Sequence, residues 1–255
     1  MGVVPYLGLK YLEFLEFLRF FLEVLKTMFT PPFRKKEFVE QLYFVMNKSL
    51  FIVVFCVSFA AVVTIIESSF HMKIVIKNDS LVPGFAALLI LRELGAVVTS
   101  LLLTSRVGAG YAAETGSMKI TEQLEALQML GINKINFIVV PRFLACMVAG
   151  LVLTIIANAA CLFFALIVTE AKLGYGLGAF LSSMRAFVSY QDFIFSAVKG
   201  TVFGSVIPLI SCFYGFKCKS GAEGVGQTTT KTVVTTTIVI IGLDFFLSWF
   251  FSYFY

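Results

Sequence analysis

The sequence predicts an all-α integral membrane protein. Of its 255 residues, 59% are hydrophobic and only 14% are charged, whereas soluble domains are about 45 to 50% apolar. Five stretches satisfy the length of about 18 or more mostly apolar residues that a membrane span requires. They lack the alternation of barrel strands, so we expect helices, whose backbone hydrogen bonds close internally. The predicted spans are residues 44–66, 82–105, 143–168, 193–216 and 233–254.

The first 30 residues predict an amphipathic helix that lies along the membrane surface. Its charged residues recur every three or four positions and therefore share one face of a helix. These residues are Glu13, Glu16, Arg19, Glu23 and Lys26. Five charges in so short a segment would be costly to bury in lipid. Pro31 and Pro32 are expected to end the helix. A helix that simply packs against the bundle is an equally good interpretation.

The distribution of basic residues predicts the orientation. We assign residues 1–43 to the amphipathic helix and a basic anchor, and residues 44–255 to a five-span domain. If the N-terminus is cytoplasmic, segments 1–43, 106–142 and 217–231 lie inside and carry most of the Lys and Arg outside the spans. The positive-inside rule favours this arrangement, which leaves the C-terminus outside. The outer loops carry Lys73, Lys77, Lys172 and Arg185. Basic residues near anionic lipid account for the net charge of +5, and nothing indicates a nucleic-acid surface.

Four ionisable residues fall well within the predicted spans, away from their ends: Arg92, Glu93, Lys199 and Asp244. Each costs about 2.5 to 3.5 kcal/mol at a helix centre on insertion scales, so these side chains should face one another or a wet cavity. Asp192 lies seven residues before Lys199, on the same helix face. One interpretation is a polar cavity that holds a charged lipid head group. The other is a set of structural pairs such as Glu93 with Lys199. Neighbours on a helix diverge, which leaves Arg92 or Glu93 free to face a partner subunit.

The segment 106–142 is soluble-looking sequence between two spans. Gly108, Gly110 and Gly116 are expected to break its first part, and a helix is expected from about residue 118 to 130. On that helix four apolar residues share a face: Ile120, Leu124, Leu127 and Leu130. Gly131 is expected to end the helix. The helix could seat in a groove of an external ATPase, or it could merely connect two spans.

No resident catalytic or nucleotide site is expected. Residues 221–228 fit the spacing of a phosphate-binding loop except that Gln227 replaces the lysine, so we expect a flexible cytoplasmic turn there. The five cysteines form no Cys-x-x-Cys pair and are interpreted as apolar packing residues. We therefore expect no metal, no cofactor and no ATPase site in this chain. The alternatives to a transport subunit are a passive channel or scaffold and an intramembrane lipid-modifying enzyme.

An ordered series of motifs resembles the MlaE/YrbE family of ABC transporter permeases. It covers roughly residues 88 to 250. The motifs are Arg92-Glu-Leu-Gly95, Arg106-Val-Gly-Ala109, Ala113-Glu-Thr-Gly-Ser-Met-Lys119, Thr121-Glu-Gln123, Ala126-Leu127, Met129-x-Gly131, Pro141-Arg142, Lys199-Gly-Thr-Val-Phe203, Thr229-Thr-Lys-Thr-Val233 and Gly242-Leu-Asp-Phe245.

The resemblance implies a homodimeric permease that moves phospholipid or a related lipid. A separate ABC-type ATPase would consume ATP on the cytoplasmic face, and an MCE-domain protein would bind on the outer face. A small STAS-domain regulator is a further partner that this setting allows. The expected location is the bacterial inner membrane, with the plastid inner envelope as the alternative.

The resemblance also implies roles for individual residues. It matches Arg92, Glu93, Asp192, Lys199 and Asp244 to polar cavity or gating positions. The coupling positions that it implies are Glu114, Gly116, Met118, Lys119, Glu122, Gln123, Ala126, Leu127 and Gly131. The sequence departs from the family pattern at Ala96, where a proline commonly follows the Arg-Glu-Leu-Gly motif, so a proline-dependent kink is not expected here.

Overall fold

The computed structural model describes residues 3–30, 34–75, 81–219 and 221–253, and this part of the chain is almost entirely helical, without a strand. Five helical runs are long and apolar enough to cross a membrane, which confirms the predicted all-α membrane fold. They are Lys35–Met72, Val82–Ile120, Ile135–Lys172, Tyr190–Phe216 and Ala222–Ser252. The elements are α1 (Val3–Met28), α2 (Lys35–Val75), α3 (Val82–Leu89), η2 (Ile90–Leu94), α4 (Gly95–Leu103), η3 (Thr104–Gly108), α5 (Ala109–Ile120), α6 (Gln123–Met129), η4 (Ile135–Val139), α7 (Val140–Leu173), α8 (Leu177–Phe187), α9 (Tyr190–Phe216) and α10 (Ala222–Ser252), where η marks a π-helical turn.

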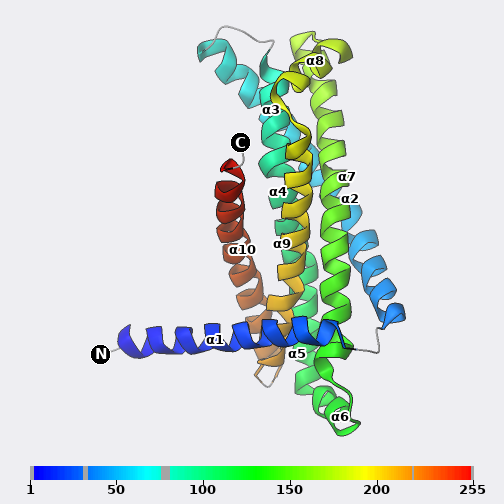
Figure 1. The fold of residues 1–255 in the computed structure, drawn as a ribbon, viewed down its shortest axis with the longest axis vertical. Coiled ribbons are helices and arrows are strands. Elements are labelled where there is room, and N and C mark those ends of the chain that lie inside the picture. The colour runs from blue at the N-terminus through cyan, green and yellow to red at the C-terminus, as the bar shows by residue number, and fades with distance from the viewer. Residues whose placement is uncertain (1–2, 31–33, 76–80, 220, 254–255) are drawn as a thin grey trace.

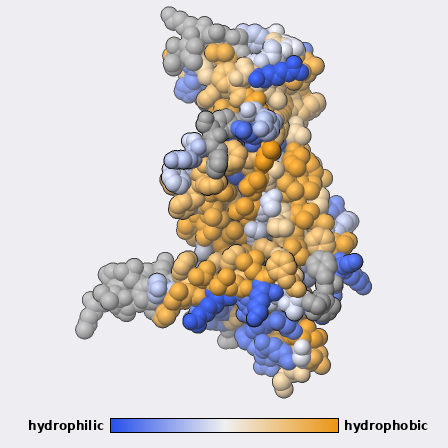
Figure 2. Space-filling model, viewed as in Figure 1, coloured by the Kyte–Doolittle hydropathy of each residue, from blue (hydrophilic) through white to orange (hydrophobic). Residues whose placement is uncertain are grey.

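The long helices run along one axis and form an elongated bundle (Figure 1). At one end α1 lies across the bundle and packs against η4, α7 and α9, and at the other end α8 packs beside α3. Apolar side chains cover most of the visible face between these two ends, and polar side chains gather below α1 (Figure 2). The molecule therefore has a broad apolar band with a polar region next to α1 and α6.

Small residues bring α7 and α9 into close contact. A Cβ atom added to Gly150 would lie 2.4 Å from the carbonyl oxygen of Gly200, and one added to Gly204 would lie 2.4 Å from that of Cys146. Contacts this short leave no room for a side chain. In a membrane, where lipid is as apolar as leucine, such small-residue seams let helices approach closely enough for van der Waals packing. This seam fixes α9, and with it the side chains that α9 carries.

The second membrane run is longer than predicted, because α5 continues it to Ile120. The expectation that Gly108, Gly110 and Gly116 break the chain is wrong, since all three lie in helix. Gly108 faces Ile207 at 3.3 Å and Gly116 faces the Cys218 sulfur at 3.3 Å, both measured from an added Cβ. These two glycines serve close packing, and tertiary contacts outweigh their low helix propensity.

Helix α1 forms as predicted, and two of its charged residues bind the bundle. Glu13 pairs with Lys231 at 2.6 Å, and Glu16 pairs with Lys217. The hydrogen bond from Lys217 and its charge lower the pKa of the Glu16 carboxyl from its usual value of 4.5. The apolar residues Leu12, Leu18 and Leu22 are exposed. The predicted helix end at Pro31 and Pro32 lies outside the described residues, and the placement of α1 in the membrane interface stays a prediction.

The other helices also extend beyond the predicted spans, because hydropathy marks only the part of a helix that contacts lipid. Helix α2 begins at Lys35, so the basic run at 34–36 belongs largely to its first turn and not to a separate anchor. Helix α8 lies in a segment that was expected to be an outer loop. It is held by the Gly84 backbone N–H, which donates to the Ser183 hydroxyl at 3.0 Å.

Candidate functional site

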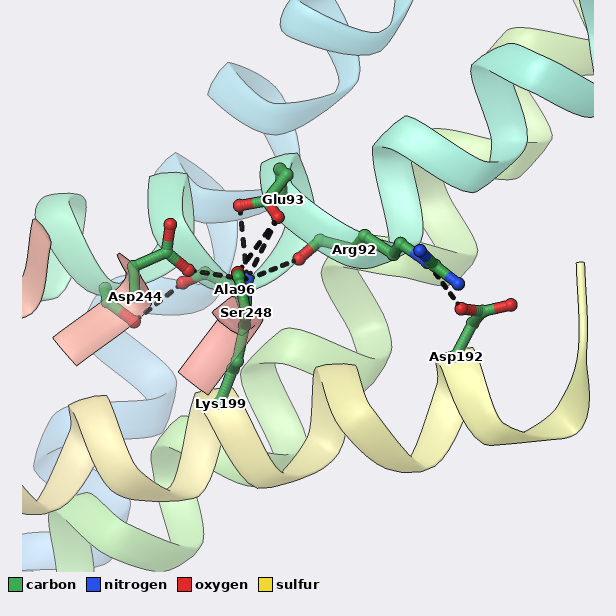
Figure 3. Close-up of polar contacts among 8 residues, drawn as sticks. Arg92, Glu93, Ala96, Asp192, Lys199, Asp244 and Ser248 are labelled. Atoms are coloured by element: carbon green, nitrogen blue, oxygen red, sulfur yellow. Dashed lines mark hydrogen bonds and ion pairs between the residues drawn. The ribbon is translucent and has the colours of Figure 1, made fainter. Parts of the chain in front are cut away.

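The π-helical turn η2 carries Arg92 and Glu93 and directs them to different neighbours. Its characteristic hydrogen bond runs from the Gly95 N–H to the Ile90 carbonyl oxygen, one residue further than in an α-helix. Single π turns inside α-helices are common at functional sites. The turn lies directly before Ala96, so this helix is distorted at the motif without the family's proline. The two side chains do diverge, as predicted (Figure 3).

Arg92 pairs with Asp192 at the start of α9. The Arg92 Nε donates to Asp192 Oδ1 at 2.7 Å, and the Asp192 side chain is fully buried. The other carboxylate oxygen accepts the Ser189 backbone N–H at 2.8 Å and completes a capping box at the first turn of α9. The Asp192 side chain therefore both caps the N-terminus of α9 and orients Arg92.

Lys199 lies at the centre of the cluster and is fully buried. Its Nζ lies 2.6 Å from Asp244 Oδ1 and 3.1 Å from Glu93 Oε2, and it donates to the Arg92 carbonyl oxygen at 2.9 Å and the Ser248 hydroxyl at 2.9 Å. The turn η2 and helix α10 thus supply these partners, and α9 carries Lys199 itself (Figure 3). A buried ammonium requires such pairing. The structural pair of Glu93 with Lys199, one of the two interpretations of the sequence, is present.

The cluster also opens to the surface. The side chain of Glu93 is 44% exposed and that of Arg92 is 34% exposed, whereas Lys199 and Asp192 are fully buried. A small pocket of about 60 Å³ lies beside them. Its lining combines both charges, two hydroxyls and two aromatic rings: Arg92, Glu93, Phe195, Ser248, Phe251 and Ser252. Buried Asp192 holds Arg92 in place, and buried Lys199 holds Glu93. The site can therefore present a cation and an anion side by side.

Ser248 was missed by sequence reasoning. Its hydroxyl accepts from Lys199 and donates to Glu93 Oε1 at 3.3 Å. A signal existed, because Ser248 follows Asp244 by four residues and therefore shares its face of α10. Serines are common in membrane helices, however, and this signal alone does not separate Ser248 from other serines.

At the other end of the bundle, the predicted helix from 118 to 130 is two helices. Helix α5 ends at Ile120, and Glu122 adopts a left-handed conformation with φ of 58° before α6 begins. A continuous helix cannot pass through that conformation. The predicted stop at Gly131 is correct, since its φ is +72°. The Ile132 N–H donates to the Leu127 carbonyl oxygen at 2.9 Å and completes a Schellman-type end.

The residues assigned to ATPase coupling occupy different environments. Glu122, Gln123, Ala126 and Gly131 are exposed at the tip, Met118, Lys119 and Leu127 are half-buried, and Gly116 is buried. Lys119 hydrogen-bonds Glu125 across the break and lowers the pKa of that carboxyl. Met129 is 90% exposed and Leu130 is 74% exposed, whereas Leu124 is 2% exposed. Glu114 is exposed and pairs with Arg142 at 2.7 Å.

The segment with phosphate-loop spacing is not a turn. Helix α10 begins at Ala222, so the residues from there to Thr228 are helical. Gly221, with φ of 93°, supplies the bend just before the helix. Phosphate loops use extended Gly-rich backbone to cradle phosphate, and this geometry does not provide it. Among the described residues, no cluster of three or more His, Cys, Asp and Glu could hold a metal ion.

Comparisons with known proteins agree with this architecture. Residues 38–250 match the protein family described as Permease MlaE. The chain is 34% identical over 219 residues to a probable ABC transporter permease protein of Synechocystis sp., which covers 84% of this chain and 81% of that protein. It is 38% identical over 163 residues to the intermembrane phospholipid transport system permease protein MlaE of Haemophilus influenzae, covering 64% of this chain and 62% of that protein.

A plant protein is also similar. The chloroplastic protein TRIGALACTOSYLDIACYLGLYCEROL 1 of Arabidopsis thaliana is 34% identical over 168 residues, which is 66% of this chain and 48% of the plant protein. The family match extends from the start of α2 almost to the end of α10 and so includes the charged cluster and the tip formed by α6. The chain is a member of the MlaE permease family.

Proposed function

We propose that this chain is the permease subunit of an ABC transporter that moves phospholipid, or a related lipid, between the inner membrane and an MCE-domain partner on the outer face. The observation that carries the proposal is the charged cluster around Lys199, which lies inside an apolar bundle of this family. Intramembrane ionisable residues are rare and costly, and they commonly mark a substrate pathway. The name of the Haemophilus relative indicates phospholipid as the class of substrate.

The cluster suits a zone where a lipid head group passes through an apolar bundle. The partly exposed Arg92 guanidinium can form two parallel hydrogen bonds with a phosphate. Asp192 would hold that guanidinium in place, and Lys199 would hold Glu93. Phe195 and Phe251, stacked with ring centroids 4.0 Å apart, provide an apolar wall. Acyl chains would stay against such walls while the head group uses the charged side chains.

The α6 end would receive motion from a separate ATPase that binds and hydrolyses ATP on the cytoplasmic face. The exposed Met129 and Leu130 form an apolar tip beyond the polar surface of α5 and α6. An exposed apolar tip beside charged residues is a typical protein contact surface. Glu122, Gln123 and Ala126 would contact the ATPase beside that tip, and α1 would lie in the inner membrane interface.

The working assembly would be a homodimer that binds two ATPase subunits and an MCE-domain protein, with a STAS-domain regulator as a further partner. The exposed sides of Arg92 and Glu93 would face the space between two copies. The N-terminus would be cytoplasmic and the C-terminus outside. The location would be a bacterial inner membrane, or the plastid inner envelope in the setting of the plant relative.

The test is purification of the chain together with the products of its neighbouring genes, followed by reconstitution into vesicles. We expect an ABC-type ATPase to co-purify and ATP to drive lipid transfer to or from the outer-face partner. Glu122→Arg should lower lipid-stimulated ATP hydrolysis or release the ATPase. Glu67→Arg is the matched control, because Glu67 is an exposed residue of α2 distant in sequence from the tip. Absence of an ATPase from the purified complex would contradict the proposal.

A further inference from the structure

Arg142 is a buried charge at the contact between α5 and α7, near the α6 end. It lies in the first turn of α7, and its side chain is only 5% exposed. Its Nη2 lies 2.7 Å from Glu114 Oε1, and its guanidinium carbon lies 4.7 Å from the centroid of the Tyr111 ring. Glu114 and Tyr111 both belong to α5, and Tyr111 is itself 1% exposed. Arg142 therefore contacts α5 through a charge and through a ring.

This contact is difficult to separate. A buried guanidinium without a counter-ion is strongly unfavourable. The Arg142 Nη1 atom is already buried without a hydrogen-bond partner, so loss of the Glu114 pair would leave the guanidinium with a second unsatisfied nitrogen. If α5 slid or rotated relative to α7, the bond to Glu114 would break while the guanidinium stayed buried. The pair should therefore hold the two helices in one register.

Helix α5 is also the element between the α6 tip and the charged cluster. Below, it is joined to α6 through Thr121 and Glu122. Above, it continues without a loop through η3 and α4 to η2, which carries Arg92 and Glu93. Against α9 it packs closely, since a Cβ added to Gly215 would lie 1.8 Å from Thr115 Oγ1. A displacement of the tip is therefore passed directly to α5, which contacts α6.

We propose that Arg142 is a positioning residue for transport. Its ion pair with Glu114 makes α5 and α7 move as one unit. A displacement of α6 then moves the charged cluster, and α5 does not slide along α7. This inference rests on the proposed function, because it assigns a route for the motion that the ATPase delivers. Neither residue touches the lipid. Arg142 acts through Glu114 on α5, and α5 acts on η2.

A purely structural role for the pair makes a different prediction. If Arg142 only stabilised the fold, its loss would lower the amount of folded complex, and transport and ATP hydrolysis would fall in the same proportion. If it transmits motion, hydrolysis continues while less lipid moves for each ATP. The ratio of lipid transported to ATP hydrolysed separates the two, because it does not depend on how much protein is folded.

The experiment uses the complete reconstituted complex with Glu114→Gln, Arg142→Gln and the double variant. Glu114 carries the main single change, because its side chain is 55% exposed and an amide fits there without a burial penalty. We expect Glu114→Gln to lower lipid transported per ATP by about fivefold or more, the lower end of usual coupling between sites. The double variant should be no worse than Arg142→Gln alone, because residues that act as one pair are not additive. Glu170→Gln, at the exposed far end of the same α7, is the control.

An unchanged ratio in Glu114→Gln would overturn the proposal, whether transport and hydrolysis both stay at the wild-type level or both fall in equal proportion. Additive losses in the double variant would equally contradict it, because the two residues would then act separately. A wild-type complex that hydrolyses ATP without moving lipid would refute the proposed function itself. Because that result is obtained with the wild-type complex, before any variant is measured, failure of the proposed function can be distinguished from failure of the Arg142 proposal.

Discussion

Replacing Lys199 with methionine tests whether Glu93 and Asp244 depend on the buried ammonium as their counter-ion. The substitution keeps an unbranched apolar stem of similar length and removes only the ammonium. Glu93 and Asp244 would then lose the counter-ion that lies 3.1 Å from one carboxylate and 2.6 Å from the other. Removing one partner of a buried ion pair typically costs about 3 to 5 kcal/mol. We expect Lys199→Met to lower the free energy of unfolding by this amount, which is about two to four orders of magnitude in the folding equilibrium.

The loss should be partly reversible by a second change. Asp244→Asn in the Lys199→Met background removes one of the two unpaired carboxylates. We expect it to restore about 1 to 3 kcal/mol, the usual cost of an unsatisfied buried polar group. Reversible unfolding in mixed micelles of a mild detergent and SDS measures both values. Lys172→Met, an exposed lysine at the far end of α7, should leave the unfolding free energy almost unchanged.

The reasoning would be refuted if Lys199→Met unfolded at the wild-type SDS concentration. Both carboxylates would then be well hydrated without the lysine, and the cluster would be an open aqueous cavity. A loss in Lys199→Met that Asp244→Asn does not reduce would contradict the pairing itself.

Three further predictions have defined outcomes. Gly95→Ala should destabilise the chain by about 1 to 3 kcal/mol in thermal unfolding, because its Cβ would lie 1.7 Å from a neighbouring amide oxygen. Gly242→Ala is the control: its Cβ would have no atom within 4 Å, and the change should stabilise its helix slightly. Glu122→Gly should stabilise the chain or leave it unchanged, despite being a glycine substitution, because φ is 58° there. The Glu16 carboxyl has a lowered pKa, so its pair with Lys217 should hold α1 to the bundle at neutral pH and release it as the pH falls through that lowered pKa. Energy transfer between fluorescent labels on α1 and on the loop before α10 measures this release, and Glu16→Gln should remove the pH dependence.

Hydropathy was enough to predict the spans and the charges inside them, because membrane burial selects composition strongly. It was harder to predict which charged side chains contact each other. Sequence spacing placed Asp192 and Lys199 on one helix face, but Asp192 binds Arg92 on another helix. A long-range contact of this kind depends on which helices pack together, and spacing along one helix does not contain that information. The pair of Glu93 with Lys199 was foreseeable only because few charges were available.

The segment between the second and third spans was predicted less well. Glycines were taken as helix breakers there, yet Gly108 and Gly116 lie in helix and face close neighbours. The actual break falls at Glu122, a residue with no breaking propensity. Local propensity is a weak guide where tertiary packing decides the backbone. The amphipathic pattern therefore located the helical segment but did not reveal the break at Glu122 within it.

The length of α2 has a consequence for how lipid could leave the membrane. At 41 residues and about 1.5 Å per residue, this helix is about 60 Å long, whereas a bilayer including its head groups is about 40 to 45 Å thick. The bundle therefore projects past the head-group layer on at least one side unless α2 is steeply tilted. A protein that docks on the projecting end would meet the permease in water, beyond the polar surface of the bilayer. A lipid handed over there needs a continuous protein wall through the head-group region, and these long helices are able to supply it.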